Sequence, residues 1–152
     1  MSASPYEPGD HFTFGDDADF VTVSVLSRSN AADYWDGNWL SCEVAVQVGG
    51  FLGRFNANLR TDELERFYNE MHKLHKTLGG AATLATTEEQ LRMELEGDGR
   101  GHILCRGRAQ DVAGTGNVLQ FEFTRDQTFL FSTVVNLGEL LNRFPVRGTP
   151  DK

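Results

Sequence analysis

Long segments of this chain alternate between apolar and polar residues with a period of two, the pattern of a β-strand buried on one side. Because successive side chains of a strand point to opposite faces of a sheet, each segment presents one apolar and one polar face. A register shift of one residue would exchange the two faces, so the alternation specifies which side chains are buried. The clearest apolar sets are Val21, Val23 and Val25; Leu40, Cys42, Val44, Val46 and Val48; and Phe51, Phe55, Ala57 and Leu59.

A helix is predicted directly after these strands. Apolar residues recur at steps of three and four from residue 64 to residue 78, which gives one apolar stripe. Thr61 is the predicted N-cap, and Gly79–Gly80 are predicted to end the helix because glycine adopts the left-handed conformation without strain. Upstream, Gly49–Gly50 predict a two-residue hairpin turn between the second and third strands. The stripe consists of Leu64, Phe67, Tyr68, Met71, Leu74 and Leu78.

The second half of the chain repeats this order of strands followed by a helix. A closing helix is predicted to begin near Asp126–Thr128 and to run to Phe144, where Pro145 prevents its continuation. Three or four strands and a helix therefore occur twice, which suggests a weak internal repeat. The strands of this half are predicted near 82–87, 91–96, 103–109 and 119–123, with turns at "GDGRG" (97–101) and "AGTGN" (113–117).

These elements predict the α+β class. Strands with one polar face are typical of antiparallel sheets, whereas parallel sheets are covered on both faces. The predicted architecture is a single antiparallel sheet of six to seven strands with two helices packed on one face, which leaves the polar face free. One domain is expected over residues 11–146, with an N-terminal tail at 1–10 and a C-terminal tail at 147–152.

The charge of the chain limits its partners. Its 152 residues include 14 basic and 22 acidic ones, which gives a formal net charge of −8. Negative charge repels phosphate backbones and so disfavours nucleic-acid binding, whereas it suits solubility or attraction to a basic protein. The N-terminus lacks a basic stretch followed by an apolar one, and no apolar run approaches the roughly 18 residues of a membrane span. The expected compartment is therefore the cytoplasm, without membrane association.

No constellation of residues predicts catalysis, a metal or a cofactor. His72 and His75 lie three apart on the predicted helix, but no further ligands follow in the spacing that helical zinc sites use. Cys42 and Cys105 occupy inward strand positions, where cysteine behaves as a small apolar residue, and both are expected to be free thiols. The sequence therefore favours a protein that is not an enzyme.

Glycine-rich and acid-rich segments also fail to predict a ligand site. "GDGRG" and "AGTGN" each lie between two predicted strands, whereas a phosphate loop needs a helix directly after its glycines. The cluster Asp16, Asp17 and Asp19 lacks the regular ligand spacing of a calcium loop. We interpret it as a solvated approach to the first strand.

Both tryptophans of the chain lie in the segment "AADYWDGNWLSCEV" (31–44), beside Tyr34 and among acidic residues. Asp36–Gly37 predict a turn, so the segment is expected to be a loop. Trp35 and Trp39 then have two interpretations. In the first, the rings fold back over the edge of the core. In the second, they form a recognition surface, because exposed aromatic side chains are effective binding anchors.

Three short motifs occur along the chain in this order: "YWDGNWL" (34–40), "GDGRGHI" (97–103), and "DQTFL" (126–130) with the closing "LLNRFPV" (140–146). In this order they resemble the WapI family of bacterial Wap-type immunity proteins, over about Asp33 to Val146. The resemblance implies a protein that protects its own cell by binding the C-terminal domain of a toxin, expected to be a nuclease, and covering its active surface. It implies no catalytic residues.

On this hypothesis the partner is a cognate toxin domain with a basic surface, which carboxylates would occupy in place of phosphates. Two alternatives stay open. One is a scaffold or binding module that acts as a homo-oligomer through its polar sheet face. The other is a small-ligand-binding protein or enzyme that uses the tryptophan loop as a pocket wall. The candidate partner-binding residues are Asp33, Tyr34, Trp35, Asp36, Glu94, Glu96 and Glu122.

Overall fold

The computed structural model describes residues 9–150, in which eight strands, two long helices and one short helix occur. Each half of the chain contributes four strands followed by a long helix, in agreement with the predicted repeat. The strands are β1 (His11–Gly15), β2 (Asp19–Arg28), β3 (Trp39–Val48), β4 (Phe51–Arg60), β5 (Gly79–Ala85), β6 (Leu91–Asp98), β7 (His102–Gln110) and β8 (Val118–Asp126). The helices are α1 (Tyr34–Gly37), α2 (Thr61–Thr77) and α3 (Gln127–Arg143).

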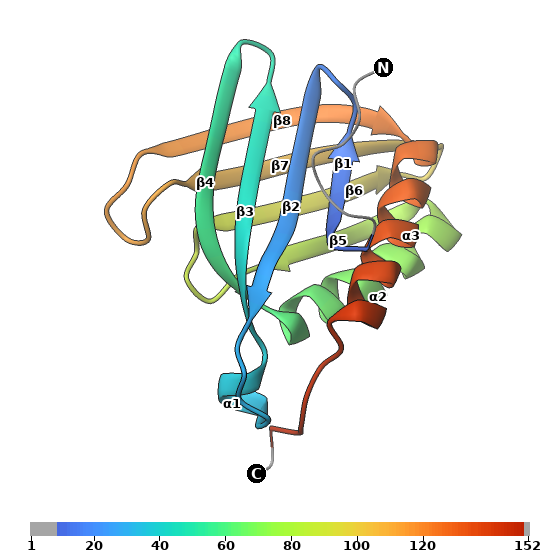
Figure 1. The fold of residues 1–152 in the computed structure, drawn as a ribbon. Coiled ribbons are helices and arrows are strands. Elements are labelled where there is room, and N and C mark those ends of the chain that lie inside the picture. The colour runs from blue at the N-terminus through green and yellow to red at the C-terminus, as the bar shows by residue number, and fades with distance from the viewer. Residues whose placement is uncertain (1–8, 151–152) are drawn as a thin grey trace.

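The strands form two antiparallel sheets, so the prediction of a single sheet is wrong. One sheet has the order β1-β2-β3-β4 and the other the order β5-β6-β7-β8. Figure 1 shows the sheets stacked face to face, with the strands of one crossing those of the other. Alternation in the sequence specifies the buried face of each strand but not which strands pair. The two halves stay separate because α2 intervenes between β4 and β5, which pair with β3 and β6.

The apolar faces of the two sheets meet in one continuous core. The ring centroids of Phe14 on β1 and Phe123 on β8 lie 5.8 Å apart, and those of Phe12 on β1 and Phe67 on α2 lie 6.3 Å apart. Burying one large apolar side chain is worth about 1.5–3 kcal/mol. The predicted inward faces are confirmed for the central strands, where the buried residues include Leu40, Cys42, Val44, Val46, Leu91, Met93, Leu95, Ile103 and Cys105.

The long helices lie along strand edges rather than on a sheet face. α2 packs beside β5, α3 packs beside β1, and the two helices contact each other (Figure 1). The Glu70 carboxylate accepts a hydrogen bond from the Thr83 N–H at 2.8 Å, and the Thr133 hydroxyl donates to the Thr13 carbonyl at 2.7 Å. Because an edge strand exposes unpaired backbone groups, these bonds explain the position of the helices. The prediction that both helices cover one sheet face is therefore wrong.

One whole strand and the start of another differ from the prediction. β1 was not predicted, because only Phe12 and Phe14 mark its apolar face, and both are fully buried. Phe51 was predicted to face inward, but its side chain is 68% exposed. It begins β4 at the tip of the β3–β4 hairpin, which projects past β8 in Figure 1.

The ends of the long helices follow the predicted signals within one or two residues. The N-cap of α2 is Arg60 rather than Thr61, and its C-cap is Leu78, one residue before the predicted glycine pair. α3 has Asp126 as its N-cap and Phe144 as its C-cap, as predicted. Within residues 9–150, no helix combines the length and the apolar character that crossing a membrane requires.

The predicted tails are only partly described. The N-terminal tail at 1–10 lies outside the described residues except for Gly9 and Asp10. Residues 147–150 of the predicted C-terminal tail are described, and Arg147 forms hydrogen bonds with the segment around α1. These contacts are part of the site below.

An ion-pair cluster joins the two sheets at the turn between β1 and β2. Arg125 of β8 donates to Asp16 at 2.7 Å and to Asp19 at 2.8 Å. The Arg125 hydrogen bond holds the pKa of Asp16 at about 2, while hydrogen bonds from the Gly49 N–H and from Arg125 lower the pKa of Asp19. The cluster does lead into β2 with Asp16 exposed, as interpreted, but the sequence did not reveal the ion pairs of Asp16 and Asp19 with Arg125.

The lowered pKa values predict that this cluster stabilises the fold only above acidic pH. A carboxyl whose pKa falls on folding contributes stability above its ordinary value of 3.8, and this contribution is lost as pH falls toward about 2. We expect Arg125→Gln to be less stable than the wild type at pH 7 and the difference to shrink between pH 4 and pH 2. Urea unfolding at each pH measures it. Arg100→Gln, which removes an exposed cation outside any ion pair of the described residues, should show no such convergence, and a constant gap for Arg125→Gln contradicts the account.

Gly107 on β7 allows the ring of Phe121 to lie across its strand. The two residues are direct partners in the β7–β8 register, and a Cβ at position 107 would lie 2.1 Å from Phe121 Cζ. Overpacking a core costs about 1–3 kcal/mol, so we expect Gly107→Ala to lower the free energy of unfolding by about that amount. Denaturant titration tests this. Gly53→Ala on β4, where the added carbon meets nothing within 4 Å, is the control; equal losses in both variants would rule out the steric explanation.

Candidate partner-binding site

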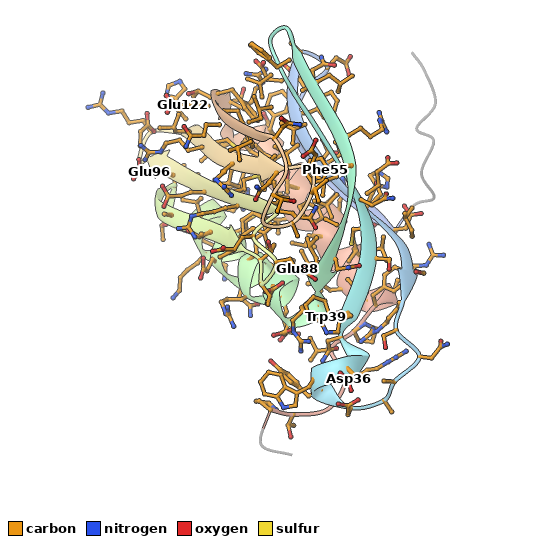
Figure 2. The ribbon with its side chains drawn as sticks, turned by 90° about the vertical axis from the view of Figure 1, so that its left-hand side faces the viewer. Asp36, Trp39, Phe55, Glu88, Glu96 and Glu122 are labelled. Atoms are coloured by element: carbon orange, nitrogen blue, oxygen red, sulfur yellow. The ribbon has the colours of Figure 1, made fainter. Side chains whose placement is uncertain are left out.

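The segment that holds both tryptophans forms the short helix α1 at one end of the molecule (Figures 1 and 2). Asp33 is its N-cap, and the Asp33 carboxylate accepts a hydrogen bond from the Asp36 N–H at 3.1 Å. The predicted loop is therefore wrong for residues 34–37, although Gly37 does end the helix. A helix of four residues is not stable in isolation, so its conformation depends on contacts with the rest of the chain.

Two arginines bind the backbone carbonyl groups of α1. Arg60 donates to the carbonyl of Tyr34 at 2.8 Å and to that of Trp35 at 2.6 Å. Arg28, at the end of β2, donates through Nε to the carbonyl of Gly37 at 3.0 Å. The last carbonyls of a helix have no partner within the helix, and a guanidinium offers five donors in one plane. The two arginines therefore replace the hydrogen bonds that so short a helix cannot form.

The guanidinium of Arg60 also lies against three aromatic rings. Its Cζ is 5.4 Å from the ring centroid of Tyr34, 5.7 Å from that of Trp35 and 5.1 Å from that of Trp39. A cation–π contact is worth about 0.5–1 kcal/mol at an exposed site and about 2 kcal/mol when desolvated. Arg60 is buried, so its contacts belong at the stronger end of that range. Its charge is balanced by Asp62, whose carboxylate accepts from Arg60 Nε at 2.9 Å.

Asn38, directly after α1, is fully buried and uses its whole side-chain amide. Its Nδ2 donates to the carbonyls of Tyr34 and Arg147, both at 2.9 Å. Its Oδ1 accepts from Arg28 Nη2 and from the Arg147 N–H, both at 2.9 Å. An amide side chain has two donor hydrogens and two acceptor lone pairs, so every hydrogen-bonding position is filled. Asn38 therefore joins α1, β2 and the C-terminal segment at one point.

The structure brings four of the predicted contact residues together on this support. Trp35 is 55% exposed, Asp33 and Asp36 are exposed, and Tyr34 is half-buried. Neither aspartate forms an ion pair with a described residue. Trp39 is half-buried against Arg60, as expected if it folds back over the edge of the core. Trp35 is exposed, as expected of a recognition surface. We call the surface formed by Asp33, Tyr34, Trp35 and Asp36 the α1 corner.

The other three predicted contact residues lie elsewhere. Glu94 and Glu96 on β6 and Glu122 on β8 occupy the outward face of their sheet. In Figure 2, Glu96 and Glu122 lie at the opposite end of the molecule from Asp36. The predicted set of seven residues therefore forms two surfaces rather than one.

The outward face of β6 and β7 carries cations beside these carboxylates. Arg106 lies 3.4 Å from Glu94 and 3.2 Å from Glu96. Arg92 and Arg108 are direct partners in the β6–β7 register on the same face. Exposed ion pairs contribute about 0–1 kcal/mol, but they neutralise charge that would otherwise attract a basic partner. Asp33 and Asp36 of the α1 corner have no such ion-pair partner among the described residues, although Arg28, Arg60 and Arg147 lie beneath the helix.

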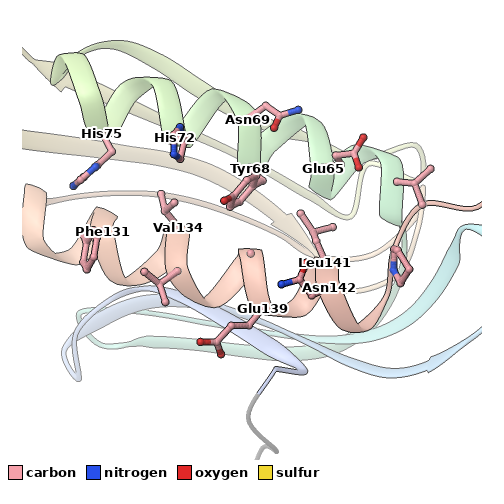
Figure 3. Close-up of a pocket in the computed structure, with 14 residues that line it drawn as sticks. Glu65, Tyr68, Asn69, His72, His75, Phe131, Val134, Glu139, Leu141 and Asn142 are labelled. Atoms are coloured by element: carbon pink, nitrogen blue, oxygen red, sulfur yellow. The ribbon is translucent and has the colours of Figure 1, made fainter.

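A groove of about 710 Å³ between α2 and α3 holds the histidine pair noted in the sequence (Figure 3). The ring of His75 lies 5.3 Å from that of Phe131, and the ring of His72 lies 6.1 Å from that of Tyr68. Across residues 9–150, no three His, Cys, Asp or Glu side chains are grouped so that they could hold a metal ion. His72 and His75 therefore contact aromatic rings rather than belonging to a ligand set.

Both cysteines are buried on inward strand positions, as predicted. Burial raises the pKa of Cys42 and of Cys105 to about 12. Nucleophilic reaction requires the thiolate, which is scarce at neutral pH when the pKa is so high. Neither thiol is therefore suited to nucleophilic catalysis.

Comparison with known families places the protein among the immunity proteins. The chain belongs to the immunity protein WapI-like family, whose family model matches residues 12–145. Families of immunity proteins in general bind a toxin and are not enzymes. Comparison with curated proteins finds no match.

Two of the motifs that carried the family resemblance form turns and helix caps. In "GDGRGHI", the Asp98 carboxylate accepts from the N–H groups of Arg100 at 2.7 Å and His102 at 3.1 Å, which closes the β6–β7 hairpin. In "DQTFL", the Gln127 N–H donates to the carbonyl of Gly101 at 2.8 Å, which ties this motif to the hairpin. Trp35, in "YWDGNWL", differs from these residues because it is a large apolar residue that is 55% exposed.

The residues that support the α1 corner were not predicted as site residues. Arg28, Asn38, Arg60 and Arg147 come from four separate segments. No spacing in the sequence marks them, because their only common feature is the place where the fold brings them together.

Arg60 provides a direct test of how α1 is held. We expect Arg60→Ala to lower the free energy of unfolding by about 1–3 kcal/mol, because carbonyls in a part-buried setting lose their donors. Arg60→Lys should recover only part of this loss, since an ammonium lacks the planar donor fork. Denaturant unfolding followed by tryptophan emission measures both. Arg66→Ala on the exposed side of α2 is the control, and a loss for Arg60→Ala no larger than the control would refute this role.

Proposed function

We propose that this protein is an immunity protein that binds a cognate toxin domain through the α1 corner and thereby covers the active surface of the toxin. The observation that carries the proposal is Trp35, which is 55% exposed on a backbone fixed by Arg60 and Asn38. Family membership supplies the immunity role. The geometry of the α1 corner supports the choice of surface.

An exposed tryptophan on a rigid support suits the centre of a protein interface. Tryptophan, tyrosine and arginine dominate the residues whose truncation weakens protein complexes most. A tryptophan buries about 150–250 Å² with only two side-chain torsions to fix. Because the backbone of α1 is already held by hydrogen bonds to its carbonyls, binding does not have to order it. Trp35 is therefore proposed as the anchor of the complex.

Charge determines which toxin surface would fit. An enzyme that acts on nucleic acid presents cations to phosphate groups, and carboxylates can occupy those positions instead. Asp33 and Asp36 flank Trp35 and form no ion pair with a described residue, so their charge is available to a partner. The proposed partner is therefore a toxin domain with a basic active surface, such as a nuclease.

The glutamates of the sheet face have a different proposed role. Glu94 and Glu96 are already paired with Arg106, and Glu96 and Glu122 lie at the far end of the molecule from Asp36 (Figure 2), so none of the three is proposed as a direct contact. Because Arg92, Arg106 and Arg108 share this face, Glu94, Glu96 and Glu122 are proposed to act only through the net charge of the protein, −8, which would attract a basic toxin domain at long range.

The proposal expects a toxin gene beside the gene of this protein, and the C-terminal domain of that toxin is the probe for a binding test. We expect Trp35→Ala to weaken the complex about 30-fold or more, the effect of losing a residue worth about 2 kcal/mol. Asp33→Lys with Asp36→Lys should weaken it further and reduce its dependence on salt. Calorimetry and surface-bound kinetics give the dissociation constants and rates. Replacing Glu94, Glu96 and Glu122 with lysine should slow association and leave dissociation unchanged.

Phe131→Ala is the matched control, because Phe131 on α3 is 54% exposed and lies in the groove between α2 and α3. The Phe131→Ala variant should bind the toxin domain with the affinity of the wild type. Cells that express the toxin domain should be rescued by the control but not by the Trp35 variant. Weak binding by the Phe131 variant together with normal binding by the Trp35 variant would refute the α1 corner. Gel filtration of the free protein tests the homo-oligomer alternative.

A further inference from the structure

The C-terminal segment runs from the end of α3 back to α1, where Figure 1 places it beside the short helix. At Arg147 its backbone forms two hydrogen bonds with the Asn38 side chain, both at 2.9 Å. Arg147 Nη1 also donates to the carbonyls of Ser29 and Ala31, both at 2.8 Å. Residues 29 and 31 belong to the segment that leads into α1. Arg147 therefore binds both this segment, before the helix, and the buried side-chain amide of Asn38, directly after it.

Gly148 brings the chain against α1 at the next position. A Cβ there would lie 2.9 Å from the backbone nitrogen of Tyr34, and the φ of Gly148 is +68°. A side chain would clash with α1 and would strain a left-handed backbone conformation. The close approach therefore requires glycine.

We infer that Arg147 and Gly148 form a latch that positions the α1 corner for its partner, an inference that rests on the proposed function. Both residues belong to the predicted C-terminal tail, 109 residues from Asn38 in sequence. The latch does not touch the partner in this proposal. It selects the one conformation of α1 in which Trp35 is presented between its two aspartates.

The chemistry beneath α1 explains why the latch affects the whole helix. Asn38 has four hydrogen bonds, and two of them end on Arg147. If residue 147 leaves, a fully buried amide loses half of its partners, and its remaining bonds to Tyr34 and Arg28 are no longer fixed in direction. The carbonyls of Ser29 and Ala31, in the segment that leads into α1, lose their hydrogen-bond donor at the same time.

Two cations also meet beneath the helix. Burial and the charge of Arg147 lower the pKa of Arg28. The carbonyls of Gly37, Ser29 and Ala31 accept from the two guanidinium groups and offset the repulsion between their charges.

Thermodynamic linkage makes the inference testable in both directions. If the closed latch favours the binding-competent α1, then the bound toxin domain must favour the closed latch by the same factor. A contact that serves only folding would not respond to the partner in this way. Amide hydrogen exchange of Arg147 therefore distinguishes a positioning role from a purely structural one.

Gly148→Ala is the principal variant, and Gly114→Ala in the β7–β8 turn is its matched control. Gly114 also has a left-handed φ, of +77°, but a Cβ there meets nothing within 4 Å. In the free protein we expect Gly148→Ala to speed exchange of the α1 amides about tenfold, while the amides of β3 and β7 are unchanged. Its complex with the toxin domain should be about tenfold weaker. The control should match the wild type in both measurements.

In the wild-type complex, exchange of the Arg147 amide should be slower than in the free protein. Asn38→Ala supplies a second variant that removes the same hydrogen bonds from the α1 side. The inference is overturned if Gly148→Ala leaves α1 exchange unchanged, or if it loosens α1 while the affinity stays normal. Trp35→Ala separates this failure from failure of the proposed function. Normal binding of the toxin domain by that variant would refute the α1 corner as the binding surface, whatever hydrogen exchange of α1 shows.

Discussion

Two apolar sheet faces bury each other in this protein, and the position of every other element follows from what that packing leaves open. Phe14 and Phe123 meet across the sandwich, and each sheet supplies residues with no exposure to solvent. The outer strands β1 and β5 would still expose backbone groups, and α3 and α2 cover them. The helices therefore complete the sandwich and add their own apolar stripes to its core.

The α1 corner arises where β2 and β3 extend beyond this core. There the chain leaves one sheet, forms four residues of helix and returns, and it has little apolar surface with which to hold that helix. Polar groups do so instead. Arg28 and Arg60 bind its carbonyls, and Asn38 joins it to the C-terminal segment. Hydrogen bonds depend more strictly on geometry than apolar contacts do, so the corner has a defined shape that leaves Trp35 outward.

Local properties of this fold could be predicted from the sequence, whereas its non-local contacts could not. The alternation at residues 40–48 and 91–96 identified the buried faces, and Asp126 and Pro145 identified the ends of α3. Sheet membership was missed because the inward face of a strand looks the same whether a helix or a second sheet covers it. Trp35 and its aspartates were recognised as a cluster. Arg60 was missed because it is an ordinary strand-end residue until the fold brings three rings to it.

A crystal structure of this protein bound to its proposed partner, a toxin domain with a basic active surface, tests the central claim most directly. The account predicts that the side chain of Trp35 lies fully buried near the centre of the interface, with Asp33 and Asp36 against cations of the toxin and α1 in the conformation described above. A complex in which the toxin domain occupies the groove between α2 and α3 or the outer face of β6–β8, with Trp35 still in solvent, would contradict it.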